Sequence, residues 1–257
     1  MRGAPARWTP GGRYDRLLHS AFFDPATAMK PRAALSWSGG KDSYLALHRS
    51  RSSYDVVAMI TMFGEDGTRS RSHGLRPEIV QAQALRLGVT LCPGLGSWAT
   101  YEAGYRRALA DARALGITHV IFGDIMYESN REFPDRVCAA EGLIPVEPLW
   151  GEPTEALYRE FVHTGADARI VTVRDGVLGP SWLGLRLTLD LLSDITRAGI
   201  DPCGEHGEYH TVVVDAPLFS SPIDFVSVGQ VCRDGCWAVD LALDDHSSPE
   251  RSHAARL

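Results

Sequence analysis

The segment SWSGGKDS at residues 36–43 combines residue types that bind phosphate groups. Its paired glycines, Gly39 and Gly40, allow the backbone to approach an anion closely and to turn N–H groups toward phosphate oxygens. Lys41 adds a compact positive charge, in a chain whose only other lysine is Lys30 and whose remaining basic residues are all arginines. We therefore expect a phosphate-binding loop formed by Ser38, Gly39, Gly40, Lys41, Asp42 and Ser43.

This segment is not a Walker loop. A Walker loop has the pattern G-x-x-x-x-G-K-[ST], whereas here its first glycine position is Leu35 and the residue after the lysine is Asp42. We expect Asp42 or Ser43 to cap a helix over YLALHRS, and the N-terminal dipole of this helix also favours an anion. A glycine turn that only starts a helix is the structural alternative.

A second polar segment, DPCGEHGEYHT at residues 201–211, lies between two apolar stretches. An exposed loop accounts for some of its polar side chains, but their density favours a binding or catalytic segment. His73 is a further candidate, although a lone histidine before a helix is more often a surface or capping residue. The candidates in the second segment are Gly204, Glu205, His206, Gly207, Glu208, Tyr209, His210 and Thr211.

These two segments carry a family resemblance. A strand followed by SGGKDS and a helix resembles the PP-loop of the ATP pyrophosphatases, which cleave ATP between its α and β phosphates. Together with GEHGEYHT, it resembles the diphthine-ammonia ligases, from about Met29 to Phe219. Further matches are His73 with Pro77, Gln81 and Ala82; Gly123-Asp124-Ile125; Arg131; Pro148-Leu149-Trp150; and Trp182-Leu183-Gly184.

The resemblance implies that ATP adenylates the carboxylate of diphthine on elongation factor 2, with release of pyrophosphate, and that ammonia then displaces AMP. The implied catalytic residues are Lys41, Glu205, Glu208 and His210, with Glu208 or His210 as the group that deprotonates ammonium. Residues 38–43, Gly123 and Asp124 would bind the nucleotide, and Asp42 and Asp124, or Glu205, would hold Mg²⁺. The implied substrate-binding residues are His73, Gly204, His206, Gly207, Tyr209 and Thr211.

Three alternatives use the same loop. The acceptor is a small-molecule carboxylate if the source is bacterial, the reaction is sulfur transfer to tRNA, or the protein binds a nucleotide without catalysis. A formal net charge of -6 and a pI of about 5.8 argue against a nucleic-acid partner. We expect a cytoplasmic protein without membrane contact, using ammonia from solution or from a partner, and a homodimer is possible.

The elements that position these residues predict an α/β fold. Unbroken β-rich runs are typical of strands buried on both faces. The runs alternate with helical spacing over residues 77–87 and 101–115, which predicts a doubly wound, parallel five-stranded sheet of the PP-loop type within residues 30–150. The expected strands are residues 33–38, 56–63, 89–92, 118–125 and 144–149.

The pattern changes after Trp150. We expect a smaller α+β substrate-binding region over residues 151–245, including a helix from about Trp182 to Ala198. Residues 1–29 read as an N-terminal extension and residues 246–257 as a flexible tail. Five scattered cysteines favour reduced thiols over a disulfide framework.

Overall fold

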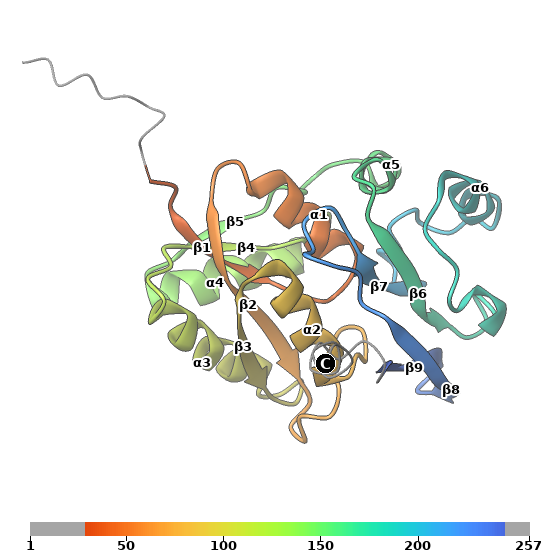
Figure 1. Cartoon of the computed structure of the whole chain (residues 1–257), viewed down its shortest axis with the longest axis horizontal. Helices are drawn as coiled ribbons and strands as arrows, with labels where there is room; N and C mark the ends of the chain where they lie inside the picture. The colour runs from red at the N-terminus through yellow and green to blue at the C-terminus, as the bar shows by residue number, and fades with distance from the viewer. Residues whose placement is uncertain (1–28, 245–257) are drawn as a thin grey trace, which may run out of the picture.

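The computed structural model describes residues 29–244, which form two β-sheets with helices around them (Figure 1). The expectations for residues 1–28 and for the tail lie outside this range. The first part contains β1 (Arg32–Ser36), α1 (Lys41–Ser50), β2 (Asp55–Phe63), α2 (Pro77–Leu87), β3 (Thr90–Leu95), α3 (Tyr101–Arg113), β4 (His119–Ile121), α4 (Glu128–Glu141) and β5 (Ile144–Val146). The second contains α5 (Thr154–His163), β6 (Asp167–Arg174), η2 (Pro180–Trp182), α6 (Leu189–Arg197), β7 (Tyr209–Asp215), β8 (Phe225–Arg233) and β9 (Cys236–Leu243).

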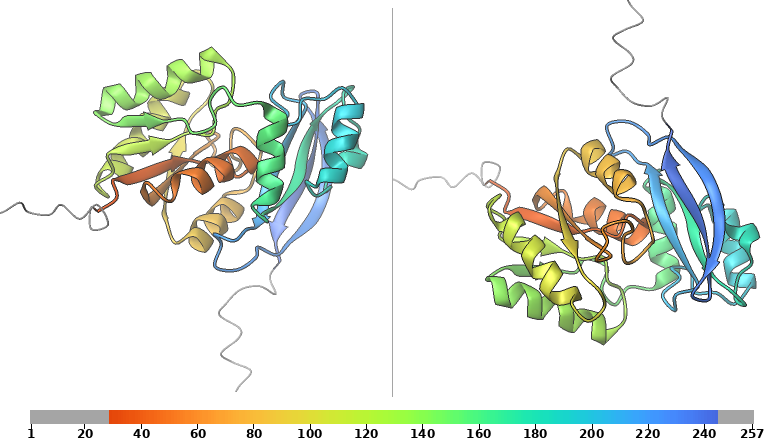
Figure 2. Two further views of the ribbon diagram at one scale, coloured as in Figure 1. Left: turned by 90° about the horizontal axis from the view of Figure 1, so that it is seen from above. Right: turned by 90° about the horizontal axis from the view of Figure 1, so that it is seen from below.

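The first sheet is parallel, with strand order β3-β2-β1-β4-β5. Its central strand β1 is buried on both faces. Ala33 and Leu35 pack in one core with residues of α1 and α2, whereas Ala34 packs in a second core with residues of α3 and α4. Helices therefore cover both faces of the sheet (Figure 2), and the predicted doubly wound α/β fold is confirmed.

The strand order reverses direction at β1. The chain moves from β1 to β2 and β3 on one side, then returns to β4 and β5 on the other side. Such a reversal leaves a crevice beyond the carboxyl ends of the two strands that flank it. The loop after β1 contains residues 37–40, and the loop after β4 contains Gly123 and Asp124, so both polar segments border this crevice.

The second sheet is antiparallel, with order β7-β6-β9-β8. Helix α5 lies at the junction of the two parts, and α6 lies on the outer side of the second sheet (Figure 2). Arg49 of α1 joins the parts, since its Nε and Nη2 bind the Glu160 carboxylate of α5 at 2.9 and 2.5 Å. The predicted α+β character of the second region is confirmed.

The predicted helix over residues 182–198 is wrong in its first half. Helix α6 begins only at Leu189, because Thr188 is its N-cap and accepts a hydrogen bond from Leu191 N at 3.1 Å. Trp182 ends the short helix η2, residues 183–184 form a turn, and Arg186 forms a β-bridge with Arg169 of β6. Gly184, with φ of +83°, adopts a left-handed conformation that a continuous helix cannot contain.

Within residues 29–244, no helix combines the length and the apolar character that crossing a bilayer requires.

Candidate functional site: a cavity beside the SGGKDS loop

Both glycines of the SGGKDS loop are required by its geometry. Gly39 has φ of +93°, a conformation that side chains disfavour. A Cβ atom at Gly40 would lie 2.5 Å from Cε1 of His73 and 2.9 Å from Oγ1 of Thr211. The loop is therefore packed tightly against His73 and β7, and no larger residue fits at Gly40 without displacing them.

Helix α1 begins at Lys41 with Gly40 as its N-cap residue. The prediction that Asp42 or Ser43 caps this helix is wrong, because both lie inside the first turn and no side chain provides a cap hydrogen bond. The Ser43 hydroxyl instead donates to Gly40 O at 3.0 Å and lies 3.2 Å from Oγ of Ser38. Asp42 keeps a negative charge near the positive end of the helix dipole.

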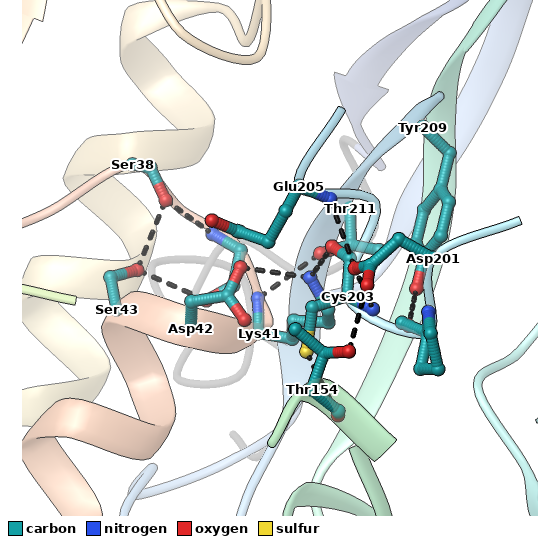
Figure 3. A network of polar contacts seen from close by, with 12 residues as sticks. Ser38, Lys41, Asp42, Ser43, Thr154, Asp201, Cys203, Glu205, Tyr209 and Thr211 are labelled. Carbon is teal, nitrogen blue, oxygen red and sulfur yellow. Dashed lines mark hydrogen bonds and ion pairs between the residues drawn. The ribbon is translucent and has the colours of Figure 1, made fainter. Parts of the chain in front are cut away.

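Lys41 is buried and points from α1 toward the 201–211 segment (Figure 3). Its Nζ donates to Asp42 Oδ2 at 2.8 Å and to the carbonyl oxygen of Cys203, and it lies 5.3 Å from the ring centroid of Tyr209. Burial lowers the pKa of Lys41, but the charge and hydrogen bond of Asp42, together with Tyr209 and Cys203, outweigh burial and hold the pKa well above its ordinary value. The ammonium group therefore stays charged inside the protein.

The backbone N–H of Lys41 also forms a hydrogen bond. It donates to Oγ1 of Thr211 at 3.1 Å, across 170 residues of sequence. Thr211 is buried on β7, and its carbonyl oxygen lies 2.8 Å from Nδ1 of His73. Thr211 thus holds the loop in place, a role that its position in a polar segment did not reveal.

A cavity of about 480 Å³ opens beside the loop, in the crevice between the ends of β1 and β4. It brings together residues from six separated stretches of sequence. Of the predicted site residues, the structure places these around it: Ser38, Lys41, Asp42, Ser43, His73, Gly123, Asp124, Gly204, Glu205, Gly207, Tyr209, His210 and Thr211. Gly39, Gly40, His206 and Glu208 do not line it.

An aromatic wall completes the cavity and was not predicted as part of the site. It consists of Trp98, Tyr101, Tyr105, Tyr127 and Phe133. The rings of Trp98 and Tyr101 stack with centroids 5.8 Å apart, and Trp98 is 72% exposed. The tyrosines of α3 were read from the sequence only as the apolar stripe of a helix, and no local signal distinguishes a stripe that faces a cavity.

Glu205 is the lining carboxyl group whose acidity the site changes most clearly. Burial raises its pKa to about 7, and the nearby negative charge of Asp42 adds to this effect, whereas Lys41 opposes it. A group that titrates near neutrality can accept and release a proton under ordinary conditions. Its backbone N–H donates to Oδ1 of Asp201 at 3.2 Å, which holds the turn that carries it (Figure 3).

Glu208 is placed differently from the sequence-based expectation. Its carboxyl group is buried outside the cavity, where Oε1 accepts a long hydrogen bond of 3.4 Å from Asp201 N. The Glu208 carboxyl group therefore does not contact a ligand bound in this cavity. His206 also lies outside the lining, and its Nδ1 is 2.5 Å from the hydroxyl of Tyr127 on the rim.

His73 and His210 stack inside the cavity with ring centroids 4.8 Å apart. Burial lowers the pKa of His210 to about 4, and the positive charge of Lys41 contributes to the shift. Burial and the neighbouring His210 also hold the pKa of His73 well below its ordinary value. Both imidazoles are neutral at pH 7, so His210 does not titrate near neutrality as the sequence-based hypothesis required.

Comparison with known protein families identifies the family of this chain. Residues 31–145 match the diphthamide synthase N-terminal domain, and residues 153–240 match the diphthamide synthase C-terminal domain. The chain belongs to the diphthamide synthase family.

Curated relatives in this family are named diphthine–ammonia ligase. That of Schizosaccharomyces pombe is 28% identical over 225 residues, which cover 76% of this chain and 37% of the yeast protein. That of Danio rerio is 34% identical over 110 residues, covering 40% of this chain and 42% of the fish protein. The chain spans about two fifths of the length of these relatives.

Two solved structures have partial similarity in fold. One is a 4-thiouridine synthetase in complex with RNA and ATP, at 17% identity and a TM-score of 0.38, covering 52% of this chain and 40% of that one. The other, described as a predicted subunit of a tRNA methyltransferase from Methanocaldococcus jannaschii, is 13% identical with a TM-score of 0.37 and covers 75% of this chain and 100% of that one.

The carboxylates of this diphthamide synthase family member fit a nucleotide-bound magnesium ion. Within residues 29–244, no group of three or more His, Cys, Asp or Glu side chains forms a metal site by itself. Magnesium, however, usually takes one or two carboxylates together with phosphate oxygens and water. Asp42 and Asp124 both line the cavity, and both raise the pKa of Glu205 through their negative charges, so the cavity contains negative charge that a cation would offset.

Proposed function

We propose that the protein is an ATP-dependent, AMP-forming ligase that converts a carboxylate to an amide with ammonia. A carboxylate at neutral pH does not react with ammonia, because its oxygen is a poor leaving group. Transfer of AMP to that oxygen releases pyrophosphate and creates an acyl-adenylate, from which AMP departs readily when ammonia attacks the carbonyl carbon. The observation that carries the proposal is one cavity lined by both a charged, buried Lys41 and a carboxyl group with a pKa of about 7.

Lys41 would stabilise the negative charge that develops as pyrophosphate leaves. A buried cation is worth more to a transition state than an exposed one, because water does not screen it. The Ser38 and Ser43 hydroxyls lie 3.2 Å apart beside it and would hold phosphate oxygens. Magnesium bound by Asp42 and Asp124 would supply further charge compensation for the phosphates.

Glu205 is our candidate for the general base, in place of Glu208 and His210. Ammonium must lose a proton before its nitrogen can attack, and a base with a pKa near the working pH is suited to this transfer. Glu205 lines the cavity and has a pKa of about 7, whereas His210 has a pKa of about 4 and Glu208 faces away.

For the acceptor we propose diphthine on elongation factor 2, following the names of the relatives. A small-molecule carboxylate remains the alternative acceptor for the same chemistry if the source is bacterial. Sulfur transfer to tRNA is less well supported, because it needs a reactive thiolate. Cys203 is the cysteine that lines the cavity, and burial raises the pKa of its thiol well above the ordinary value.

The test is incubation with ATP, Mg²⁺ and candidate carboxylates, with and without ammonium, followed by identification of the nucleotide product. We expect AMP and pyrophosphate, with amide formation only when ammonium is present. Lys41→Met should reduce pyrophosphate release at least about 100-fold, as loss of one charge-stabilising donor does in other enzymes. The matched control is Lys30→Met, because Lys30 is exposed and donates to Arg51 O, outside the cavity lining.

Two results would contradict this function. Production of ADP and phosphate would exclude adenylation. Near-normal pyrophosphate release by a folded Lys41→Met protein would remove Lys41 from the mechanism. The fold of the variant is checked by circular dichroism and thermal melting, because Lys41 is also part of the buried network in Figure 3.

A further inference from the structure

Gln83 is a completely buried polar side chain on α2 that contacts the PP-loop directly. Its Nε2 donates to Gly39 O at 3.0 Å and to Val213 O of β7 at 2.8 Å. Its Oε1 accepts a hydrogen bond of 2.7 Å from Nε1 of Trp37. One amide group therefore links α2, the end of β1, the loop and the second sheet.

The orientation of this amide is determined by its partners. The indole of Trp37 can only donate, so the Gln83 atom that faces it must be the oxygen. The nitrogen then faces two carbonyl oxygens, which can only accept. Gly39 O also accepts from Val213 N at 2.8 Å, so two donors hold this one carbonyl.

Fixing the Gly39 carbonyl also fixes the next N–H group. In a trans peptide the C=O and the N–H point in opposite directions. The Gly40 N–H, which shares a peptide unit with Gly39 O, therefore points away from Gln83. It lies 3.3 Å from Oγ of Ser38, a residue that lines the cavity. This separation is long for an N–H···O bond, so a charged phosphate oxygen can replace the hydroxyl.

We propose that Gln83 is a positioning residue that, with Val213 N, holds the Gly39–Gly40 peptide so that the Gly40 N–H points toward Oγ of Ser38, which lines the phosphate-binding side of the cavity. Glycines have little intrinsic preference between the two orientations of such a peptide. Without the amide of Gln83, Val213 N is the one of these two donors that still holds the Gly39 carbonyl. The peptide then rotates more easily and presents the negative end of this carbonyl to the phosphates. This inference rests on the proposed binding of ATP phosphates at the loop.

The family resemblance pointed to Gln81 instead of Gln83. Gln81 lies on the same helix but is exposed. The two glutamines therefore provide a matched pair of variants. The same substitution can be made at the buried Gln83 and at the exposed Gln81. Methionine has a similar length and no hydrogen-bonding amide, so it preserves packing and removes the two donated bonds.

The experiment measures the dissociation constants of Mg-ATP and of adenosine by calorimetry, without acceptor or ammonia, in the wild type, Gln83→Met and Gln81→Met. We expect Gln83→Met to weaken ATP binding about tenfold or more. Adenosine binding should change by less than about twofold, because adenosine has no phosphates. Gln81→Met should match the wild type for both ligands. If Gln83→Met does not fold, Trp37→Phe should give a smaller loss confined to ATP, since it frees the amide to turn.

Two outcomes would overturn the inference, and a third would contradict the proposed function. Equal weakening of ATP and adenosine in a folded Gln83 variant would assign Gln83 a purely structural role and overturn the inference. Unchanged ATP binding in that variant, or in Trp37→Phe when it serves as the substitute, would do the same. Failure of the wild type to bind ATP would contradict the proposed function itself, which separates the two failures.

Discussion

The carboxyl group of Glu205 and the ammonium group of Lys41 line one cavity, but the site favours the charged form of Lys41 and the neutral form of Glu205. Lys41 has an ion-pair partner, Asp42, at 2.8 Å, and Asp42, Tyr209 and Cys203 together hold its pKa well above the ordinary value despite burial. Glu205 is surrounded by further carboxylates, so burial and repulsion together favour its neutral form at pH values where an exposed glutamate is charged. The negative charge of Asp42 therefore stabilises the charge of Lys41 and disfavours that of Glu205.

Replacing Glu205 by glutamine should stabilise the free protein at alkaline pH. The folded state has a pKa of about 7 for this group, above the ordinary value that applies to the unfolded chain. Between these two values the folded state holds more protons, so stability falls as the pH rises through this window and stays low above pH 7. Glu205→Gln should remove this decline and gain about 1–3 kcal/mol at pH 8, but little at pH 4.

Urea unfolding at several pH values measures this effect. The exposed Glu132 provides a control, because Glu132→Gln should change stability by less than about 0.5 kcal/mol at either pH. Loss of amide formation together with a gain in stability would identify Glu205 as a functional group held in an unfavourable state. A Glu205→Gln protein that is less stable than the wild type at pH 8 would show that its carboxylate is stabilising.

At the scale of the elements, much of the first sheet could be predicted from sequence because its signals are local. Strand β2 is an unbroken apolar run, and α2 begins with Pro77 and ends before Gly88, which has φ of +68°. Helix α4 also ends before a left-handed glycine, Gly142, but Pro134 lies inside it, and proline normally ends a helix. Strand β3 extends past the predicted residue 92 through Pro93, which an edge strand tolerates.

The contact between α3 and β3 depends on a glycine that the sequence pattern did not explain. A Cβ atom at Gly104 of α3 would collide with the carbonyl oxygen of Leu95 and lie 2.8 Å from Cε of Met62. Leu95 is at the end of β3, and its carbonyl is backbone, so the helix must move to relieve the collision. The close approach of this helix to the sheet therefore requires a residue without a side chain.

Gly104→Ala should destabilise the protein by about 1–3 kcal/mol, although alanine favours a helix by about 1 kcal/mol over glycine. Thermal or urea unfolding measures the change. Ala103 is adjacent and exposed, so Ala103→Gly should lose only the helix preference, about 1 kcal/mol. A stabilised Gly104→Ala protein would mean that α3 moves away from β3 freely. Such movement would also shift Tyr101 and Tyr105, which line the cavity.

At the scale of the whole molecule, the sequence motifs identified the two segments of the site but not the hydrogen bonds that hold the loop against the second sheet. SGGKDS and GEHGEYHT are local patterns, and most of their residues do line one cavity. The bonds that shape the loop join residues far apart in the chain, as with Gly39 to Val213 and Lys41 to Thr211. No local pattern encodes such pairs, because their proximity depends on how the second sheet packs against the first part.

A cluster of charged side chains stabilises the contact between the second sheet and the α2 side of the first part. Asp240 of β9 accepts hydrogen bonds from Nε and Nη2 of Arg76 at 2.9 and 2.7 Å, and from Nη1 of Arg69 at 2.7 Å. Hydrogen bonds from these two arginines hold the pKa of Asp240 well below its ordinary value. Arg76 directly precedes α2, so the cluster ties the helix that carries Gln83 to the second sheet.

Asp240→Asn should lower the free energy of unfolding at pH 7 by about 1–3 kcal/mol, because it removes the charge that two arginines share. The carboxylate stabilises the fold above its ordinary pKa, and this contribution declines as the pH falls from about 4 toward the lower folded pKa. The gap between wild type and variant should therefore be constant from pH 5 to 8 and narrow below about pH 4. A double-mutant cycle with Arg76→Met measures the coupling, and a coupling near zero would mean that apolar packing alone holds the second sheet in place.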